Sequence, residues 1–132
     1  MIDSMGKVLV VEDNNLNLKL FYDLLMIKKC EVVVSKDGVG VIEIASKEAL
    51  DLILMDIQLG SGISGIDLIK DLKKNIMTKH IPIIAITAFA MKNDEAEISR
   101  SGCDMYLQKP VSIDSFFKAI DNFINPKPPI QR

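Results

Sequence analysis

The chain of 132 residues is poor in several residue types, and each scarcity argues against a class of protein. It has no tryptophan and only two cysteines, Cys30 and Cys103, which lie far apart and form no C-x-x-C motif. Two reduced, buried thiols are therefore expected. Basic residues do not outnumber acidic ones, and the formal net charge of -2 argues against nucleic acid as a partner.

Long apolar runs are also missing. No run approaches the roughly 18 apolar residues of a membrane span, so no membrane association is expected. The N-terminal residues MIDSMGK lack the apolar stretch of a signal peptide, which predicts a cytoplasmic protein. The length fits one domain, for which we expect an N-terminal extension (1–6), a folded domain (7–124) and a tail (125–132) whose three prolines leave the last helix.

Short apolar runs alternate with amphipathic segments along the chain. Five of these runs read as strands, at residues 7–11, 31–35, 50–55, 82–87 and 104–108. The first, third and fourth are apolar almost throughout, as is typical of parallel strands covered on both faces. This alternation predicts an α/β fold of (βα)5 type, with a doubly wound parallel five-stranded sheet and right-handed crossovers.

Two of the intervening segments have the spacing of a helix with one buried face. In the first, the apolar positions are Leu16, Leu20, Phe21, Leu24 and Leu25. In the last, they are Ile113, Phe116, Phe117, Ile120, Phe123 and Ile124, preceded by Ser112 at the position of an N-cap. The segment KNDEAEIS is only weakly amphipathic, which suits a mobile element that binds a partner.

Polar residues stand where four of the predicted strands end. They are Glu12 and Asp13 after the first strand, Asp56 at the end of the third, Thr87 at the end of the fourth, and Lys109 after the fifth. Because the carboxyl ends of parallel strands meet at one edge of the sheet, these side chains are expected to gather there. Three carboxylates brought together repel one another, and Mg2+, which prefers oxygen ligands, would relieve that repulsion.

The remaining residues of this predicted edge suit a phosphoryl group. The Lys109 ammonium is a compact positive charge, and the Thr87 hydroxyl can donate a hydrogen bond. No cysteine stands at a strand end, and the single histidine, His80, lies in a loop. The nucleophile of such a site would therefore be a carboxylate, as in other aspartyl-phosphate chemistry.

The segments VVEDN, LILMDIQ, AITAFA and LQKP together resemble the motifs of response-regulator receiver domains of two-component signalling. The resemblance covers about residues 7 to 124, with the motifs in the right order and spacing. It implies the flavodoxin-like strand order 2-1-3-4-5. The chain is similar in particular to stand-alone receivers of cell-cycle or developmental control. Because the tail after the last predicted helix is too short to fold, no output domain is expected.

The resemblance also implies roles for the strand-end residues. Asp56 would be the phosphoacceptor, and Thr87 and Lys109 would hold the phosphoryl oxygens. The Mg2+ ligands would be Asp13, Asp56, the Gln58 backbone carbonyl and, through water, Glu12. The protein would then be no enzyme beyond catalysing its own phosphorylation and dephosphorylation.

Partners follow from the same resemblance. The phosphoryl group would come from a histidine kinase or a phosphotransfer protein, and the output would be contact with a downstream kinase or regulator protein. The switch pair would be Thr87 and Tyr106, and the peptide bond before Pro110 would be cis. The partner surface would lie on the fourth helix, fifth strand and fifth helix, with Ala90, Met91, Lys92 and Tyr106 near its centre.

The stretch GSGISG (60–65) matches G-x-G-x-x-G, the fingerprint of dinucleotide-binding folds. That fingerprint belongs directly after the first strand and is followed by an acidic residue at the next strand end, whereas this stretch follows the third strand and the next strand ends in Thr87. The P-loop motif is absent, and Asp56-Ile57-Gln58 departs from the D-x-D of haloacid-dehalogenase phosphatases. A non-phosphorylated adaptor that acts only through protein binding remains the alternative from another class.

This glycine-rich stretch is also where the chain departs from the receiver pattern. Receivers usually have proline four residues after the phosphoacceptor, where this chain has Gly60, and the usual loop glycine comes one residue late, at Gly65. We interpret this as a one-residue insertion in a loop that should be more mobile than a proline loop. The insertion leaves the Gln58 carbonyl in place but makes the first turn of the next helix harder to predict.

Overall fold

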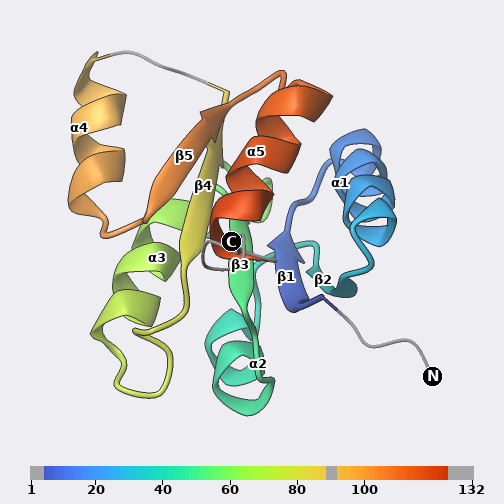
Figure 1. The fold of residues 1–132 in the computed structure, drawn as a ribbon. Helices are drawn as coiled ribbons and strands as arrows, with labels where there is room; N and C mark the ends of the chain where they lie inside the picture. Colours follow the sequence, from blue (N-terminus) through green and yellow to red (C-terminus); the bar gives the residue numbers. More distant parts are fainter. Residues whose placement is uncertain (1–4, 89–91, 125–132) are drawn as a thin grey trace, which may run out of the picture.

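The computed structural model describes residues 5–88 and 92–124, in which strands and helices alternate along the chain (Figure 1). The strands are β1 (Lys7–Val11), β2 (Glu31–Ser35), β3 (Leu52–Asp56), β4 (Ile83–Thr87) and β5 (Met105–Gln108). The helices are α1 (Asn15–Ile27), α2 (Val41–Lys47), α3 (Gly65–Lys74), α4 (Lys92–Arg100) and α5 (Ile113–Phe123). All five predicted strands are confirmed. The third begins two residues later than predicted and includes Asp56 as its last residue.

The strands form one parallel sheet in the order β2-β1-β3-β4-β5, as expected. The register places Val11 at the end of β1 beside Met55 of β3, and Asp56 beside Ile86 of β4. The residues that follow β1, β3 and β4 therefore leave the sheet at one common edge. This edge is where ligands bind in open α/β sheets.

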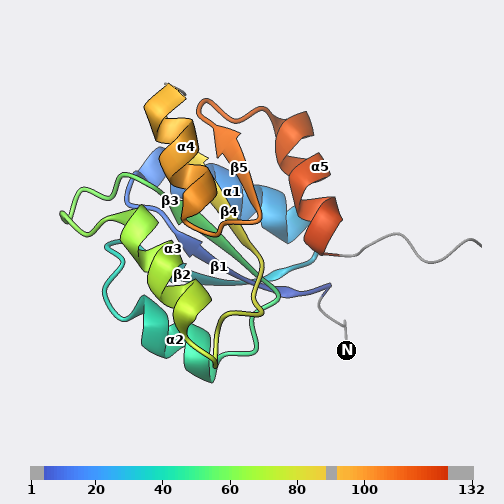
Figure 2. The same cartoon turned by 90° about the vertical axis from the view of Figure 1, so that its left-hand side faces the viewer.

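Two layers of helices cover the sheet. Helices α1 and α5 pack on one face, and α2, α3 and α4 pack on the other (Figure 2). All residues of β1, β3 and β4 are buried between these layers except Lys7, the charged residue at the start of β1. The rings of Phe21 and Phe116 stack with their centroids 5.3 Å apart and join α1 to α5. No helix in the described part of the chain is long and apolar enough to span a bilayer.

Two residues of the predicted apolar helix faces are exposed instead. The exposed fraction is 80% for Leu16 and 53% for Ile113, whereas the later positions Phe21 and Phe116 are buried. Leu16 and Ile113 both lie in the first turn of their helices, after the N-caps Asn14 and Ser112. That first turn lies level with the sheet edge, where there is no strand beneath it to cover an apolar side chain.

The two cysteines are both free thiols, as expected. Cys30 is buried, but Cys103 is only half-buried, so its predicted burial is wrong. It lies in the turn between α4 and β5, beside the hollow described below.

Gly65 is the residue that lets α3 begin directly against the end of β3. Its N–H donates to the carbonyl of Ile57 at 3.1 Å, and the N-cap Ser64 accepts a hydrogen bond from the Asp67 N–H. A Cβ at Gly65 would overlap the Asp56 carbonyl oxygen and lie 2.7 Å from the Ile57 Cα. Because both neighbours are backbone atoms that end a buried strand, they cannot move aside cheaply.

We therefore expect Gly65→Ala to lower the free energy of unfolding by about 1–3 kcal/mol, the range of overpacked core sites. The control is Gly62→Ala, because a Cβ at Gly62 meets nothing within 4 Å. Gly62 has φ near +89°, so alanine there costs only backbone strain of about 1 kcal/mol. Urea denaturation of both variants measures these losses. Equal losses of unfolding free energy would mean that the close approach to the Asp56 carbonyl is not the reason for glycine at position 65.

Candidate functional site

Three carboxylates gather at the carboxyl edge of the sheet, as predicted from the strand ends. Glu12 and Asp13 follow β1, Asp56 ends the neighbouring strand β3, and one oxygen from each lies within 4.8 Å of the others. Glu12 and Asp56 are buried, with exposed fractions of 1% and 3%, and Asp13 is half-buried. None of the three caps α1, because Asn14 is the N-cap and accepts from the Asn17 N–H at 3.0 Å.

Lys109 brings a positive charge to this cluster from the end of β5. Its Nζ lies 3.3 Å from Asp56 Oδ2 and 3.3 Å from Glu12 Oε1. Its backbone N–H donates to the Thr87 carbonyl at 2.7 Å, which holds this segment against β4. The Lys109–Pro110 peptide bond is cis, as the resemblance implied. Lys109 thus joins carboxylates from two other strands, β1 and β3.

The negative charge of the cluster is only partly balanced. Among the described residues, Lys109 is the one cation paired with it. Glu12 Oε2 accepts the Asn14 N–H at 3.1 Å, but Oε1 accepts no hydrogen bond in the described part of the chain. Burial, followed by repulsion from Asp56, raises the pKa of Glu12 from 4.5 to about 7, against the opposing effects of the Asn14 hydrogen bond and the Lys109 charge.

Asp56 is held by contacts at both of its oxygens. Oδ1 accepts the Gln58 N–H at 3.0 Å, and Oδ2 faces the Lys109 ammonium. Thr87, 2% exposed, ends β4 one residue beyond Ile86, the register partner of Asp56. The structure thus brings Thr87 to the same sheet edge as Asp56. The role of the Gln58 carbonyl as a metal ligand stays a prediction.

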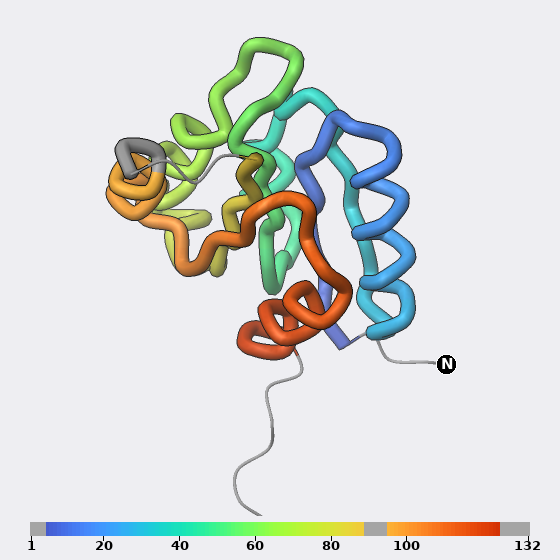
Figure 3. Tube along the Cα trace, turned by 90° about the horizontal axis from the view of Figure 1, so that it is seen from above, coloured from blue at the N-terminus to red at the C-terminus, as the bar shows by residue number. Residues whose placement is uncertain are grey.

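Asp13 has a partner that the sequence analysis missed. Its Oδ2 accepts the backbone N–H of Gly60 at 2.6 Å, across the mouth of the site. Figure 3 shows the loop after β3 rising beside the loop after β2, and the Ser61 hydroxyl joins them by donating to the Asp37 carbonyl at 2.7 Å. Glycine in place of the usual proline was the only signal for this contact, because proline has no N–H to donate.

The residues of the cluster fit a hard divalent cation. They offer carboxylate oxygens from three side chains, the ligand type that Mg2+ prefers. The Oε1 atom of Glu12 is buried and accepts no hydrogen bond among the described residues, so it can accept one from a metal-bound water. Burial and, after it, repulsion from Asp56 raise the pKa of Glu12, and a nearby cation would favour its charged form.

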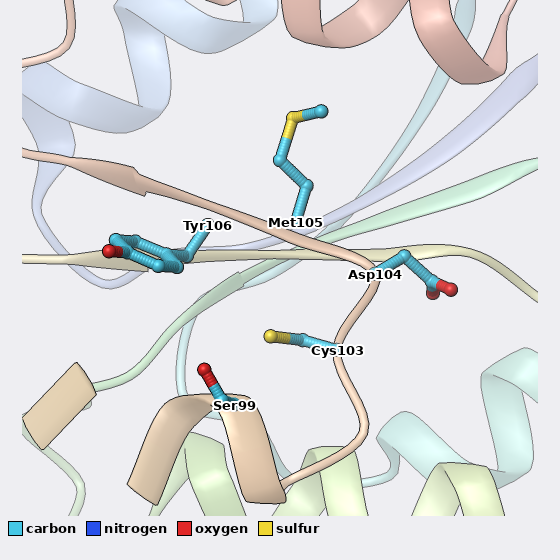
Figure 4. Close-up of a pocket in the computed structure, with 5 residues that line it drawn as sticks. All are labelled: Ser99, Cys103, Asp104, Met105 and Tyr106. Carbon is cyan, nitrogen blue, oxygen red and sulfur yellow. The ribbon is translucent and has the colours of Figure 1, made fainter. Parts of the chain in front are cut away.

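Tyr106 lies on β5 away from the acid cluster, and 38% of it is exposed. The negative charge of the Glu95 carboxylate of α4 is the largest cause that raises the pKa of its phenol. A hollow of about 390 Å³ between α4 and β5 is lined by Ser99, Cys103, Asp104, Met105 and Tyr106. Figure 4 shows that Met105 points to the side of β5 opposite Ser99.

Of the four residues predicted at the centre of the partner surface, three have side chains outside the described part of the structure. Ala90 and Met91 lie outside the described residues, and Lys92 begins α4 without a described side chain. Tyr106 is the member of this predicted set whose side chain the structure places.

Comparison with known proteins agrees with this fold. The family model for the response regulator receiver domain matches residues 8–121. The polar-differentiation response regulators DivK of Brucella anthropi and Brucella melitensis are each 44% identical to the chain over 117 residues. These alignments cover 89% of this chain and 94% of each relative.

Solved structures give the same result. The receiver domain of a sensor histidine kinase from Pseudomonas aeruginosa, solved with a magnesium ion coordinated in its active site cleft, is 26% identical with a TM-score of 0.81. That similarity covers 89% of this chain and 96% of that one. The chemotaxis protein CheY4 of Vibrio cholerae, at 23% identity and a TM-score of 0.82, covering 91% of this chain and 99% of that one, shares the fold. With this sheet, a family match over most of the chain and relatives at 44% identity, the chain belongs to the response regulator receiver domain family.

Proposed function

We propose that this receiver accepts a phosphoryl group on Asp56 from a histidine kinase or a phosphotransfer protein. The observation that carries the proposal is a buried carboxylate at the sheet edge, flanked by two further acids and facing the Lys109 ammonium. A carboxylate that only ended a strand would need neither the acids nor the lysine. An adaptor that was never phosphorylated would gain nothing from burying this charge, which costs several kcal/mol where pairing is incomplete.

In the proposed reaction an Asp56 oxygen attacks the phosphorus of a phosphohistidine. An O–P bond forms as the N–P bond breaks, and the leaving imidazole takes up a proton. The Gln58 N–H fixes the carboxylate through Oδ1, and Lys109 stands ready to pair with a phosphoryl oxygen near Oδ2. Thr87, at the adjacent strand end, would donate its hydroxyl to another phosphoryl oxygen.

Asp13, Asp56 and the Gln58 carbonyl would hold Mg2+, with Glu12 acting through water. When bound, the ion would neutralise the charge of the phosphoryl oxygens and of the carboxylates. The magnesium ion in the similar receiver from Pseudomonas aeruginosa supports this assignment. The three-acid cluster of this chain supplies the matching ligand chemistry.

The output would be protein contact on the face formed by α4, β5 and α5. The Tyr106 ring would turn inward, away from Glu95, when the Thr87 hydroxyl moves toward the phosphoryl group. The similarity to DivK, described as a polar-differentiation regulator, supports a role in cell-cycle or developmental control through a downstream kinase or regulator. We also propose that the receiver domain spans residues 7–124 and acts as a stand-alone protein in the cytoplasm. We propose that it binds neither nucleic acid nor membrane.

A small phosphodonor with Mg2+ should add one phosphoryl group to the wild-type protein, and Asp56→Asn should abolish the addition. The reason is that an amide nitrogen is no nucleophile for this transfer. Intact-protein mass spectrometry, with Mg2+ present or chelated, measures the change. Asp67→Asn, an exposed acid in the first turn of α3, is the control that should stay reactive.

Two outcomes would contradict the phosphoacceptor assignment. Undiminished labelling of Asp56→Asn would place the phosphoryl group elsewhere. No labelling of folded wild-type protein by a small donor, a histidine kinase or a phosphotransfer protein would favour the adaptor function.

Without metal, the wild-type protein should lose stability relative to Glu12→Gln as the pH rises from about 4.5 to 7. The folded-state pKa of Glu12 is raised above its value of 4.5, so the folded protein binds this proton more tightly than the unfolded chain does. The stabilisation that this bound proton contributes is complete below about pH 4.5 and is lost as the pH rises through about 7. The expected slope approaches about 1 kcal/mol per pH unit.

Chemical denaturation of both proteins in chelator at several pH values tests this difference. Saturating Mg2+ should reduce the pH dependence, because the cation favours the charged carboxylate. A difference between wild type and Glu12→Gln that stayed constant with pH would refute the raised pKa.

Lys109→Ala should keep Mg2+ binding but lose the response of α4 to phosphorylation. The metal ligands are all retained, whereas the ammonium that links Asp56 to the end of β5 is gone. Amide spectra of Glu95 and Ile98, recorded before and after phosphorylation, measure the response. If these signals stay unchanged on phosphorylating the wild-type protein, the proposed coupling to α4 is wrong.

A further inference from the structure

One acid of the cluster is held in a different way from the other two. Glu12 and Asp56 each accept a backbone N–H and each face the Lys109 ammonium. Asp13 is half-buried, and the hydrogen-bond donor that the described part of the chain gives it is the Gly60 N–H, 2.6 Å from Oδ2. That distance is short, as is typical of a hydrogen bond to a charged oxygen. The orientation of the Asp13 carboxylate therefore depends on Gly60.

The loop between β3 and α3 that carries this donor is fastened at several points. Gln58 and Ser64 pair in an antiparallel bridge that closes the loop at its base. The Ser61 hydroxyl donates to the Asp37 carbonyl at 2.7 Å, which ties the loop to the one after β2. Leu59, directly before the donor, is buried. The donor is thus held in position by contacts that do not involve Asp13.

Close approach, rather than backbone conformation, is the reason for glycine at position 60. A Cβ at Gly60 would lie 2.5 Å from Asp13 Oδ2, so any side chain there would push the carboxylate away. Gly60 is not among the residues with positive φ, unlike Gly62 in the same loop. Proline, the usual residue of receivers at this point, would fill the same space and has no N–H to donate.

A hydrogen bond to one oxygen of Asp13 leaves the carboxylate able to bind a cation. A carboxylate has two oxygens with about four lone-pair sites, and the Gly60 N–H occupies one of them. What the bond restricts is rotation of the carboxylate, and with it the direction of the remaining lone pairs. Such restriction matters most to Mg2+, which demands near-octahedral geometry, and less to Ca2+, which accepts flexible geometries.

We propose that the Gly60 N–H orients the Asp13 carboxylate for Mg2+, so that Gly60 is a positioning residue that raises the affinity of the site for this ion and its selectivity over Ca2+. The inference rests on the proposed function, because it takes the acid cluster as a metal site. It adds a residue that acts on the metal only through Asp13. Hydrogen-bond partners of metal-binding carboxylates typically change metal affinity by about 10- to 100-fold.

The hydrogen bond itself can be observed in the wild-type protein. A scalar coupling across the bond, between the Gly60 nitrogen and the Asp13 carboxyl carbon, should be detected by nuclear magnetic resonance in chelator. The same coupling should persist at saturating Mg2+, because the donor and the cation use different lone pairs of the carboxylate. Absence of the coupling, or its loss when Mg2+ binds, would overturn the inference, whether or not any variant folds.

A Gly60→Ala variant tests the effect on the metal. The added Cβ displaces the Asp13 carboxylate, so the affinity for Mg2+ alone should fall about 10-fold, whereas the affinity for Ca2+ should fall no more than about 3-fold. The matched control is Gly62→Ala, since a Cβ there meets nothing within 4 Å. Its Mg2+ affinity should stay within about 2-fold of wild type. Isothermal titration calorimetry measures both ions on both variants.

A double-mutant cycle shows whether Gly60 acts through Asp13. Asp13→Asn removes one proposed ligand and should itself weaken Mg2+ binding. In that background Gly60→Ala should change the remaining Mg2+ affinity by less than about 2-fold, because the carboxylate that it positions is gone. An equal further loss in both backgrounds would mean that Gly60 acts on the fold of the loop, and would refute the positioning role.

The outcomes distinguish this inference from the proposed function. If wild type binds Mg2+ and Asp13→Asn weakens it, but Gly60→Ala binds Mg2+ as tightly as wild type, the metal site stands and the inference is refuted. Equal losses of Mg2+ and Ca2+ affinity in Gly60→Ala would refute the selectivity. If folded wild-type protein binds no Mg2+, the metal assignment and the inference both fail.

Discussion

The ion pairs of Lys109 with Glu12 and Asp56 at the sheet edge depend on the parallel register and burial of the whole sheet. Glu12, Asp56 and Lys109 come from three different strands, and their distances are set by the parallel register of a buried sheet. Two carboxylates with so little exposure are costly to bury, and one ammonium offsets that cost only in part. The stiffness of the apolar strands β1, β3 and β4 therefore holds the charges together against their repulsion.

Much of this arrangement could be predicted from sequence because two simple patterns coincide. Apolar runs identified the buried strands, and the polar residues directly after them had to meet at one edge. The strand order came only from the family resemblance, since periodicity does not specify which strands are neighbours. Leu16 and Ile113 show a second limit, because apolar spacing marks the face of a helix but not where the sheet beneath it ends.

The glycine-rich stretch was harder to interpret, because its glycines have different structural roles that the local sequence does not indicate. Gly65 lets α3 start against the Asp56 carbonyl, and Gly60 lets the backbone reach the Asp13 carboxylate. Both are close approaches to an acid site, although the motif matches one that binds phosphates. The one-residue insertion stays an interpretation of the sequence. The Gly60–Asp13 contact could not be predicted, because it joins residues 47 positions apart.

The limited supply of positive charge also explains how a small chemical change could have a distant effect. On the proposed function, a phosphoryl group on Asp56 would draw the Lys109 ammonium away from Glu12 and add charge beside Thr87. The Lys109 N–H is bonded to the Thr87 carbonyl, so β4 and β5 would respond together. Tyr106 lies three residues before Lys109 on β5, and its phenol is close enough to Glu95 of α4 for that charge to raise its pKa. A redistribution of charge at the edge would thus reach the α4 face through β5 and the electrostatic interaction of Tyr106 with Glu95.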